Sequence, residues 1–470
     1  MNDYSKISRV YFLGIGGIGM SALARYFLNK KIIVSGYDKT PSTLTAELEK
    51  EGAHIHYTDD IQLLDKQAEL IIYTPAIPNG HKEFNWYKNE DYKILKRSDV
   101  LYALTQSSFS ICIAGTHGKT TTSTMIAHIL RNSGFGCSAF LGGISVNYHT
   151  NYWSNSNNVV VVEADEYDRS FLKLSPDIAL ISSMDADHLD IYGTVENMRE
   201  AFAQFAAEVK EGGLLLTKFG ILDKNLIASN HLRYSLSNET ADSYAINILM
   251  KNGGYEFDVV GKDWVIENMK LNIGGMHNVE NVVAAITIAK YLKIDDDKIR
   301  NAVAEFKGVK RRFEYIINSE EAKTLRNNVV YIDDYAHHPE ELKALIKSAK
   351  ALFNKRKCTI IFQPHLYSRT RDFAKEFAAA LDLADEIILL PIYPARELSI
   401  EGVSSEMIVR LMENKNASVL SKELVLKYLR STYLQTVSES VNGQMLLTAG
   451  AGNIDQMIQP IKRIIESDDF

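Results

Sequence analysis

The residues best suited to chemistry in this chain lie in a short glycine-rich stretch, Gly115-Thr116-His117-Gly118-Lys119-Thr120. An apolar run over 109–114 precedes it, and an apolar run with helical spacing follows it as far as Gly134. A strand, a glycine loop and a helix in this order place loop N–H groups and the positive end of a helix dipole around an anion. Lys119 adds a mobile positive charge, and the Thr120 hydroxyl can bind Mg²⁺. The stretch therefore predicts a nucleotide phosphate site.

One position departs from the usual phosphate-loop pattern. That pattern places its first glycine five residues before the second, where this chain has Ile113. The chain keeps the Gly-Lys-Thr end and lacks the first glycine. The alternative is a tight strand-to-helix turn with a solvated lysine. We favour the phosphate site, because the strand and the helix that it requires are predicted on both sides.

Carboxylates and an imidazole follow the next two predicted strands. Four consecutive valines, 159–162, predict a buried strand that ends in Glu163, and a carboxylate there needs a cation partner. A second strand over 178–182 leads to His188, whose imidazole can also bind a metal. These residues, with Thr120, predict a Mg²⁺ site beside the phosphates. A solvated acidic loop is the alternative for Asp165, Glu166 and Asp168, and we favour it for Asp168.

A second glycine-rich stretch, Gly14-Ile15-Gly16-Gly17-Ile18-Gly19, matches the dinucleotide fingerprint G-x-G-x-x-G. A short apolar strand over 10–13 precedes it, and a helix over 20–28 and a strand over 32–36 follow it. Asp38 lies 24 residues after Gly14, where such units place an acid for a ribose hydroxyl. The fingerprint indicates a diphosphate on a helix N-terminus and not a nicotinamide, and UDP-linked compounds also carry a diphosphate. The alternative is a turn of this shape without a ligand.

The last third of the chain alternates strands and helices. Strands are predicted at 329–332, 358–362, 386–390 and 445–448, and helices at 340–353 and 372–383. This order predicts a third doubly wound α/β unit, which binds ligands at the carboxyl ends of its strands. The His337-His338 pair follows one strand, and Arg369 follows the next. A guanidinium at that edge is a natural clamp for a carboxylate or a phosphate.

Two further sets of polar residues each have two readings. A predicted helix over 276–292 carries Asn278 and Asn281 three residues apart, and thus on one face. Their amides could read an adenine edge, whereas Asn278 could instead be the N-cap. His54 and His56 alternate along a short strand, and we interpret them as surface residues, because no third metal ligand lies near them in the sequence.

The composition excludes several classes of protein. The 470 residues include 59 acidic and 52 basic side chains, so the net charge of −7 provides no electrostatic footprint for nucleic acid. Three scattered cysteines cannot form a disulfide framework, which fits a reducing cytoplasm. No signal peptide opens the chain, and no apolar run approaches the ~18 residues of a membrane span. We expect a cytoplasmic protein of about three domains without nucleic-acid or membrane partners.

Together these motifs resemble those of the Mur amide ligases of bacterial cell-wall synthesis, and the resemblance covers nearly the whole chain. The family's own phosphate loop also lacks the first glycine, which accounts for Ile113. The motifs that carry the resemblance are Gly14–Met20, Gly115–Thr120, Glu163–Glu166, Asp187–Asp190, His277-Asn278 with Asn281, Arg311–Phe313, Asp333–Pro339 and Gln363–Thr370.

The resemblance implies an α/β fold of three domains: a Rossmann-like UDP-sugar-binding domain (residues 1–106), a central P-loop ATPase-like domain for ATP and Mg²⁺ (107–313), and a C-terminal Rossmann-like domain for the amino acid (314–470). The implied reaction is the ATP-dependent joining of L-alanine to the lactyl carboxylate of UDP-N-acetylmuramate through an acyl phosphate, in peptidoglycan precursor synthesis. These three small molecules are the expected partners, and the chain is expected to be a monomer or a homodimer.

The resemblance also assigns residues to sites. Residues implied to bind ATP are Gly115, Thr116, Gly118, Lys119, Thr120, Thr121, Asn278, Asn281, Arg312 and Asp334. Among them, the asparagines lie at the adenine, Arg312 at the γ-phosphate and Asp334 at the ribose. Thr120 and Glu163 are implied to hold one Mg²⁺, and His188 a second. Residues implied to bind the UDP-sugar are Gly14, Gly16, Gly17, Gly19, Met20 and Asp38. His337, His365 and Arg369 are implied to face the amino acid and the muramyl carboxylate. The residues implied in catalysis are Lys119, His188, Arg312 and His337.

Two positions depart from the family pattern. Several sister ligases have a carbamoylated lysine where this chain has Phe202, so we predict no such lysine. Thr74–Ile77 stands where relatives often have Ser-Ser-Ala-Ile, which leaves the UDP-sugar contacts there open. Within the family, the alternative is the ligase that attaches a recycled tripeptide, although the segment 363–370 favours a single amino acid. Outside it, the alternatives are an NAD-dependent oxidoreductase with an ATPase domain and a regulatory ATP-binding protein.

Overall fold

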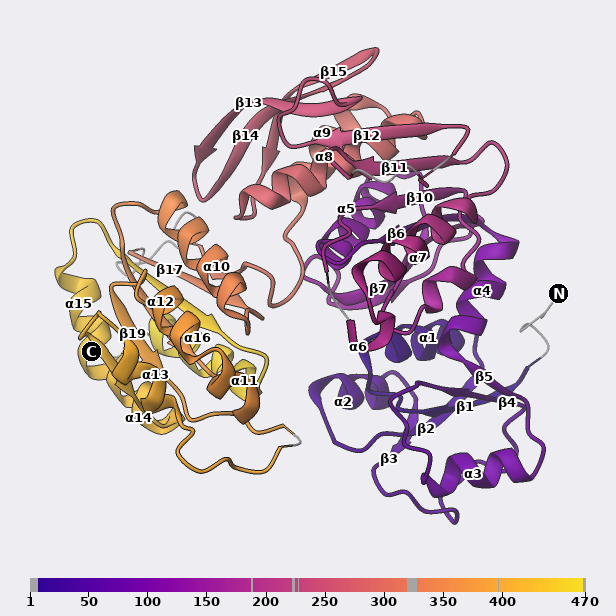
Figure 1. Cartoon of the computed structure of the whole chain (residues 1–470), viewed down its shortest axis with the longest axis horizontal. Helices are drawn as coiled ribbons and strands as arrows, with labels where there is room; N and C mark the ends of the chain where they lie inside the picture. Colours follow the sequence, from indigo (N-terminus) through magenta and orange to yellow (C-terminus); the bar gives the residue numbers. More distant parts are fainter. Residues whose placement is uncertain are drawn as a thin grey trace. The chain divides into compact units, whose positions relative to one another are not determined.

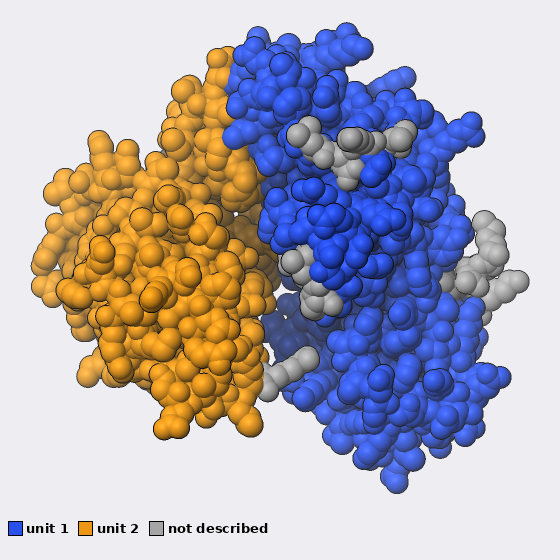
Figure 2. All heavy atoms as spheres, in the orientation of Figure 1, with its two compact units in different colours: residues 1–246, 258–269, 280–306 blue, residues 247–257, 270–279, 307–470 orange. Residues whose placement is uncertain are grey.

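The structure, a computed structural model, describes residues 7–186, 189–221, 225–226, 228–318, 328–395 and 397–467. The chain divides into two compact units (Figure 2). Unit 1 comprises residues 1–246, 258–269 and 280–306, and unit 2 comprises residues 247–257, 270–279 and 307–470. Three sheets with accompanying helices make up the described chain (Figure 1). The predicted α/β fold with three sheet-containing parts is confirmed.

The first sheet belongs to unit 1, and all its strand pairs are parallel. Its order is β3-β2-β1-β4-β5, with β1 (Arg9–Leu13), β2 (Ile33–Tyr37), β3 (His54–His56), β4 (Leu70–Tyr73) and β5 (Ile94–Lys96). Its helices are α1 (Ile18–Asn29), α2 (Thr43–Lys50), α3 (Lys82–Asn89) and α4 (Arg97–Ser107). Strand order reverses at β1, so the first glycine loop, between β1 and α1, lies at a switch point where α/β sheets bind ligands.

The second sheet has ten strands in the order β15-β14-β13-β12-β11-β10-β6-β9-β7-β8. Its strands are β6 (Phe109–Ala114), β7 (Ser138–Ser145), β8 (Thr150–Trp153), β9 (Val159–Glu163), β10 (Ile178–Ile181), β11 (Leu214–Lys218), β12 (His231–Ser235), β13 (Ser243–Lys251), β14 (Gly254–Gly261) and β15 (Trp264–Leu271). Its helices are α5 (Lys119–Asn132), α6 (Leu189–Tyr192), α7 (Val195–Ala207), α8 (Met276–Tyr291) and α9 (Asp296–Glu305). The central β6 lies between β9 and β10. The carboxyl ends of β9 and β10 therefore lie beside the loop that follows β6, Gly115–Thr120, which we call the second glycine loop.

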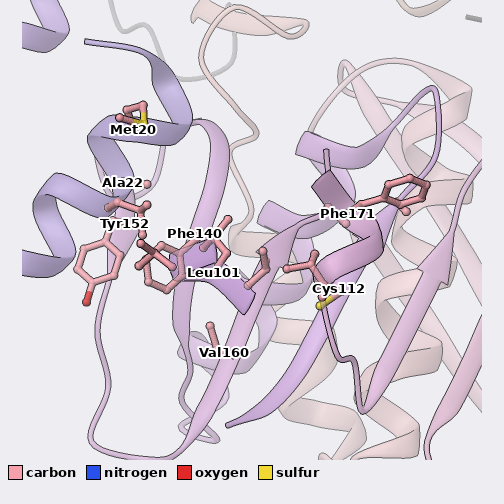
Figure 3. Close-up of a cluster of buried hydrophobic side chains, with 14 of the residues drawn as sticks. Met20, Ala22, Leu101, Cys112, Phe140, Tyr152, Val160 and Phe171 are labelled. Atoms are coloured by element: carbon pink, nitrogen blue, oxygen red, sulfur yellow. The ribbon is translucent and has the colours of Figure 1, made fainter. Parts of the chain in front are cut away.

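One apolar core connects the first two sheets, as Figure 3 shows. Met20 of α1 and Leu101 of α4 belong to the same cluster as Phe140 of β7 and Tyr152 of β8. A polar contact adds to this packing, because the buried Asn151 side chain donates to the carbonyl of Ile18 at the start of α1, with 2.6 Å between nitrogen and oxygen. The helix that carries the first glycine loop is therefore fixed against the sheet that carries the second.

The third sheet belongs to unit 2 and has the order β16-β17-β21-β18-β19-β20, with only β16 antiparallel. Its strands are β16 (Glu314–Ile317), β17 (Val329–Asp334), β18 (Lys357–Phe362), β19 (Glu386–Leu389), β20 (Ala417–Val419) and β21 (Gln444–Ala449). Its helices are α10 (Pro339–Leu352), α11 (Tyr367–Asp372), α12 (Ala374–Leu381), α13 (Ser405–Leu411), α14 (Lys422–Tyr428), α15 (Leu434–Glu439) and α16 (Ile458–Glu466). Val330 and Tyr331 enter separate apolar clusters on opposite faces, as strand alternation requires.

Two sequence predictions about local structure were wrong. The helix expected over 372–383 begins earlier and is interrupted, since α11 ends at Asp372, Phe373 leaves helical geometry with ψ of 22°, and α12 follows. His54 is exposed as expected, but His56 is only partly exposed and its Nε2 lies 2.7 Å from the Tyr11 hydroxyl. His54 and His56 lie two residues apart and so share one face of β3, and they differ because Tyr11 of β1 and Glu83 of α3 reach only the His56 ring.

Two sequence expectations concern the membrane and the cysteines. Among the described residues, no helix combines the length and apolarity needed to cross a membrane. Cys112, Cys137 and Cys358 are all buried, and each carries a free thiol.

Candidate functional site

Two glycines give the Gly115–Thr120 loop its shape. Gly115 and Gly118 have φ angles of +130° and +82°, which side chains rarely adopt. A Cβ atom at Gly115 would also overlap Ser182 Oγ, at the end of β10. Gly118 is the N-cap of α5 and offers no side chain, so the N–H groups of the first helical turn have no acceptor within the helix. The predicted strand, loop and helix are therefore present, and the loop between them has the kind of backbone that suits an anion.

Lys119 is held across this loop by a buried acid. Its Nζ lies 2.6 Å from the Gly115 carbonyl oxygen and 2.7 Å from Glu166 Oε1. The Glu166 side chain is only 1% exposed, and the Lys119 side chain is 15% exposed. Burial raises the pKa of Glu166 above its usual value, and Lys119 opposes part of that rise. A solvated loop is therefore wrong for Glu166, which is the charge partner of the loop lysine.

Glu163 reaches the same loop from the end of β9. Thr120 Oγ1 donates to Glu163 Oε1 over 3.0 Å, and the Gly142 N–H donates to Oε2 over 3.0 Å. A Cβ atom at Gly142 would overlap this carboxylate, so the glycine on β7 makes room for it. A hydroxyl beside a carboxylate is the kind of oxygen donor set that Mg²⁺ takes. His188, the other predicted metal ligand, lies outside the described residues, as does Asp187.

Ser183, which follows β10, contacts two residues at the start of the second glycine loop. Thr116 Oγ1 lies 2.9 Å from Ser183 Oγ, and the His117 N–H donates to the same oxygen over 2.7 Å. Thr121 lies buried in the first turn of α5. Asp168, favoured as a solvated acid, is partly exposed and accepts a hydrogen bond from the Ser170 N–H.

The two asparagines of α8 differ in what they contact. A Cβ atom at Gly118 would lie 3.1 Å from Asn281 Oδ1, so the Asn281 amide lies against the phosphate loop. The Asn278 amide donates to the Gly274 carbonyl oxygen over 2.7 Å. The helix begins at Met276, so the N-cap alternative for Asn278 is wrong. Both side chains are buried.

The first glycine loop, Gly14–Gly19, also connects a strand to a helix N-terminus, but the side chains around it differ from those at the second glycine loop. Gly14 has φ of +85°, and a Cβ atom there would lie 2.6 Å from Thr74 Cγ2. The Gly16 N–H donates to Asp38 Oδ2 over 2.8 Å, which places the predicted ribose acid at the loop. Gly17 is the N-cap of α1 without a capping side chain, and the first turn holds no acid. These features leave the α1 N-terminus open to an anion.

Gly19 and Met20 complete the first turn of α1. The Met20 side chain is buried in the core shown in Figure 3. Gly19 lies against Arg97 of α4, because a Cβ atom there would lie 3.0 Å from the guanidinium carbon of Arg97.

In unit 2, Asp334 is held by the backbone. Its Oδ2 accepts from the Phe313 N–H and its Oδ1 from the Ala336 N–H, both over 2.7 Å. Burial raises the pKa of Asp334 to about 6, and these N–H groups oppose part of that rise. Arg311 pairs with the neighbouring Asp333 over 3.1 Å, whereas Arg312 is exposed in the turn before β16.

Three predicted residues lie around the carboxyl ends of β17 and β18. The rings of His337 and His365 have centroids 6.3 Å apart, and His365 stacks on Tyr393 at 5.9 Å with 17° between planes. Burial lowers the pKa of both histidines, so both are neutral near pH 7. Arg369, on α11, has its buried Nη1 without a hydrogen-bond acceptor among the described residues. A cation with neutral imidazoles suits a small carboxylate ligand.

The structure thus groups the predicted residues into two sets, one in each unit. Unit 1 holds both glycine loops with Asp38, Glu163 and Asn281, and unit 2 holds Asn278, Arg312, Asp334, His337, His365 and Arg369. Sequence reasoning missed Gly142, Ser183 and Arg97, and left Glu166 open. Glu166 stands in a run of acids, and the sequence offers no periodicity there that separates buried from solvated carboxylates.

Three protein-family models match consecutive segments of the chain. The one described as Mur ligase family, catalytic domain, matches residues 9–108. The Mur ligase middle domain matches residues 113–289. The model described as Mur ligase, glutamate ligase domain, matches residues 311–452.

Curated proteins and solved structures point the same way. The chain is 46% identical to the UDP-N-acetylmuramate--L-alanine ligase of Cytophaga hutchinsonii, over 99% of this chain and 98% of that protein. It is similar to the crystal structure of UDP-N-acetylmuramate-alanine ligase MurC from Thermotoga maritima, with 28% identity, a TM-score of 0.79 and coverage of 97% and 98%. A murein peptide ligase from Psychrobacter arcticus shares the fold, with 22% identity, a TM-score of 0.65 and coverage of 98% and 100%.

Proposed function

The chain belongs to the Mur ligase family, and from that premise we propose that it is an ATP-dependent ligase that joins L-alanine to the lactyl carboxylate of UDP-N-acetylmuramate, with release of ADP and phosphate. The observation that carries the proposal is that one compact unit holds two different glycine loops. One has a lysine and a hydroxyl, each paired with a carboxylate, and the other has an open helix N-terminus beside an acid. Two such loops suit one nucleotide that reacts and a second that is only held.

The second loop is the proposed ATP site. Backbone N–H groups from Gly115 to Thr121 would surround the phosphates, with Thr116 and Gly118 shaping the loop and Lys119 leaving Glu166 for the β- and γ-phosphates. Thr120 and Glu163 would hold Mg²⁺, and His188 is the proposed ligand of a second ion. Bound Mg²⁺ would neutralise charge on the phosphate oxygens. The oxygen donors of Thr120 and Glu163, 3.0 Å apart, fit such an ion.

Activation of a carboxylate as an acyl donor accounts for the charged side chains at the second glycine loop. A carboxylate is a poor acyl donor, so a carboxylate oxygen of the muramyl group would attack the γ-phosphorus and displace ADP, which forms an acyl phosphate. Lys119 would stabilise the negative charge spread over the transferring phosphoryl oxygens. Arg312 is the proposed second cation for this step, and Asp334 and the two asparagines are proposed to hold the ribose and the adenine.

The amide bond would then form at the groups of unit 2. The alanine amine attacks the acyl carbon, phosphate leaves, and the amine loses a proton. His337 is suited to take that proton, because its Nδ1 lies 3.0 Å from the Tyr335 carbonyl oxygen, which leaves Nε2 as the acceptor. Arg369 and His365 are the proposed clamp for the alanine carboxylate.

The first loop is the proposed UDP-sugar site. The N–H groups of Gly16, Gly17, Gly19 and Met20 would face the diphosphate, Gly14 would permit the turn, and Asp38 would accept from the ribose. We propose the domain limits 1–106, 107–313 and 314–470 for the UDP-sugar, ATP and amino-acid parts, which the order of the three family matches supports. We place the activity in the cytoplasm and expect a monomer or a homodimer.

The test is phosphate release from Mg·ATP in the presence of UDP-N-acetylmuramate and L-alanine, with each component omitted in turn. The proposal expects release only when all three are present. Release with the recycled tripeptide, and not with L-alanine, would show that the chain is the family member that attaches the tripeptide. Release that does not need the UDP-sugar would contradict the proposal, and NAD binding at the first loop would then be tested.

A further inference from the structure

Arg97 lies at the first glycine loop although no motif includes it. It is the first residue of α4 and follows β5 directly. Its guanidinium carbon would lie 3.0 Å from a Cβ atom at Gly19, and its Nη1 still closer. Gly19 is the second residue of α1, and its φ is not in the left-handed region that favours glycine. The glycine is therefore needed for space, and the space is occupied by a cation at the N-terminus of α1.

The Arg97 guanidinium also contacts the acidic segment 163–166, whose glutamates pair with the second glycine loop. Its Nη2 lies 3.2 Å from Asp165 Oδ2. Asp165 stands between Glu163, the partner of Thr120, and Glu166, the partner of Lys119. Arg97 thus links the proposed diphosphate site to the acidic segment of the proposed ATP site.

This ion pair is of the kind that a stronger anion replaces. The Arg97 side chain is 21% exposed and the Asp165 side chain is 45% exposed, so water screens both charges. Ion pairs that water screens in this way contribute little to stability. A diphosphate carries more charge than one carboxylate and can accept two parallel N–H bonds from a guanidinium. The open N–H groups of the α1 first turn would bind the same anion.

We propose that Arg97 binds the diphosphate of the UDP-sugar, and that Asp165 is the counter-ion that it gives up when the UDP-sugar enters. This inference rests on the proposed function. It assigns opposite roles to the two partners of one ion pair: Arg97 favours substrate binding, and Asp165 competes with the substrate.

Calorimetry on the full chain, with UDP-N-acetylmuramate, UDP and UMP as probes, tests this assignment. Arg97→Ala is expected to weaken binding of UDP-N-acetylmuramate and UDP by about 10–100-fold, as loss of a charge-assisted hydrogen bond does, and to weaken UMP less. Asp165→Asn is expected to strengthen UDP binding by about 2–5-fold, the equivalent of a weak competing ion pair. In the Arg97→Ala background, Asp165→Asn should have no further effect.

A purely structural ion pair would behave differently. In that case both single variants would weaken UDP binding, and that result would overturn the inference, as would unchanged binding in Arg97→Ala. Lys173→Ala is the matched control, because Lys173 pairs with Asp99 of α4 and so links the same helix to the same region without reaching the loop. It should leave UDP binding unchanged.

Folding and the proposed function are checked separately. If Arg97→Ala does not fold, Arg97→Lys replaces it. This variant is expected to lose part of the affinity for UDP, because lysine keeps the positive charge but lacks the paired N–H groups of the guanidinium. Wild-type protein that does not bind UDP-N-acetylmuramate would contradict the proposed function. Wild-type binding without dependence on Arg97 would overturn this inference alone.

Discussion

The two glycine loops of unit 1 follow the same backbone plan but carry different chemistry. Each follows a buried central strand, and each ends in a helix whose N-cap is a glycine. Positive φ angles occur at Gly14 in the first loop and at Gly115 and Gly118 in the second. The second loop carries its own lysine and hydroxyl, and both are paired with carboxylates. The first loop carries no charged side chain, and its charges come from Asp38 and Arg97 on other elements.

This difference shows how one backbone design serves two purposes. Backbone N–H groups can hold a phosphate in either loop. Only the second loop places a cation and a metal-binding hydroxyl where charge would develop during phosphoryl transfer. The first loop therefore suits holding a diphosphate, and the second suits reacting with one.

The largest effect is expected from Lys119→Ala. This change removes the loop cation, so turnover should fall about 10³-fold or more, since one preorganised donor alone is worth about 10²–10³-fold. Affinity for UDP-N-acetylmuramate should stay within about twofold, because the first loop has its own donors. Phosphate release and calorimetry measure the two quantities. Loss of UDP-sugar affinity would mean that the two loops are not separate sites.

The next effect concerns Glu163. Glu163→Gln keeps an acceptor for the Gly142 N–H but removes the negative charge from the proposed metal site. Turnover at fixed Mg²⁺ should fall about 10²-fold and recover partly at higher Mg²⁺, because the site binds the ion less tightly. A Mg²⁺ titration of phosphate release measures this. Asp168→Asn, which changes an acid that only caps a turn, should leave the Mg²⁺ requirement unchanged.

A smaller effect is expected at the first loop. Asp38→Ala removes the acceptor of the Gly16 N–H and the proposed ribose contact. UDP-sugar affinity should fall about tenfold, as for one charge-assisted hydrogen bond. The affinity for ATP should not change. Equal loss of both affinities in calorimetry would mean that Asp38 supports the fold of unit 1 rather than one site.

Sequence patterns located both loops because their signals are local. The runs 109–114 and 10–13 predicted β6 and β1, and glycine spacing predicted the turns after them. The partners of the loops depend on tertiary packing and have no such signal. Glu166 is buried and Asp168 is not, within one run of acids, because only the former lies under Lys119.

The same limit applies beyond the loops. The partners of His56 leave no local signal, because Tyr11 and Glu83 lie 45 and 27 positions away in the sequence. The break at Phe373, which sets the position of Arg369 on α11, also had no sequence signal such as proline or glycine. Local order was therefore predictable, whereas pairing between distant segments was not.

A buried glutamate beside each of the first two sheets also distinguishes them. Glu166, three residues after the end of β9 in the second sheet, has Lys119 as its partner. Glu83, beside the first sheet, is fully buried and accepts hydrogen bonds from the Tyr11 hydroxyl over 2.6 Å and the Asp60 N–H over 3.1 Å. Burial raises the pKa of Glu83 to about 7, and these two hydrogen bonds oppose part of that rise.

Glu83 is therefore expected to change the pH dependence of stability and to have the smallest effect on the reaction itself. Between the usual glutamate value near 4.5 and about 7, folded Glu83 keeps a proton that the unfolded chain has lost. The folded state then binds more protons, so the free energy of unfolding falls as pH rises through this window, by up to about 3 kcal/mol in total. Glu83→Gln should remove this slope, measured by denaturant unfolding from pH 4.5 to 8. Glu90→Gln, an exposed acid just after α3, should keep it. An unchanged slope in Glu83→Gln would mean that the two hydrogen bonds offset burial, and that the first sheet holds its acid without a cation at no cost in stability.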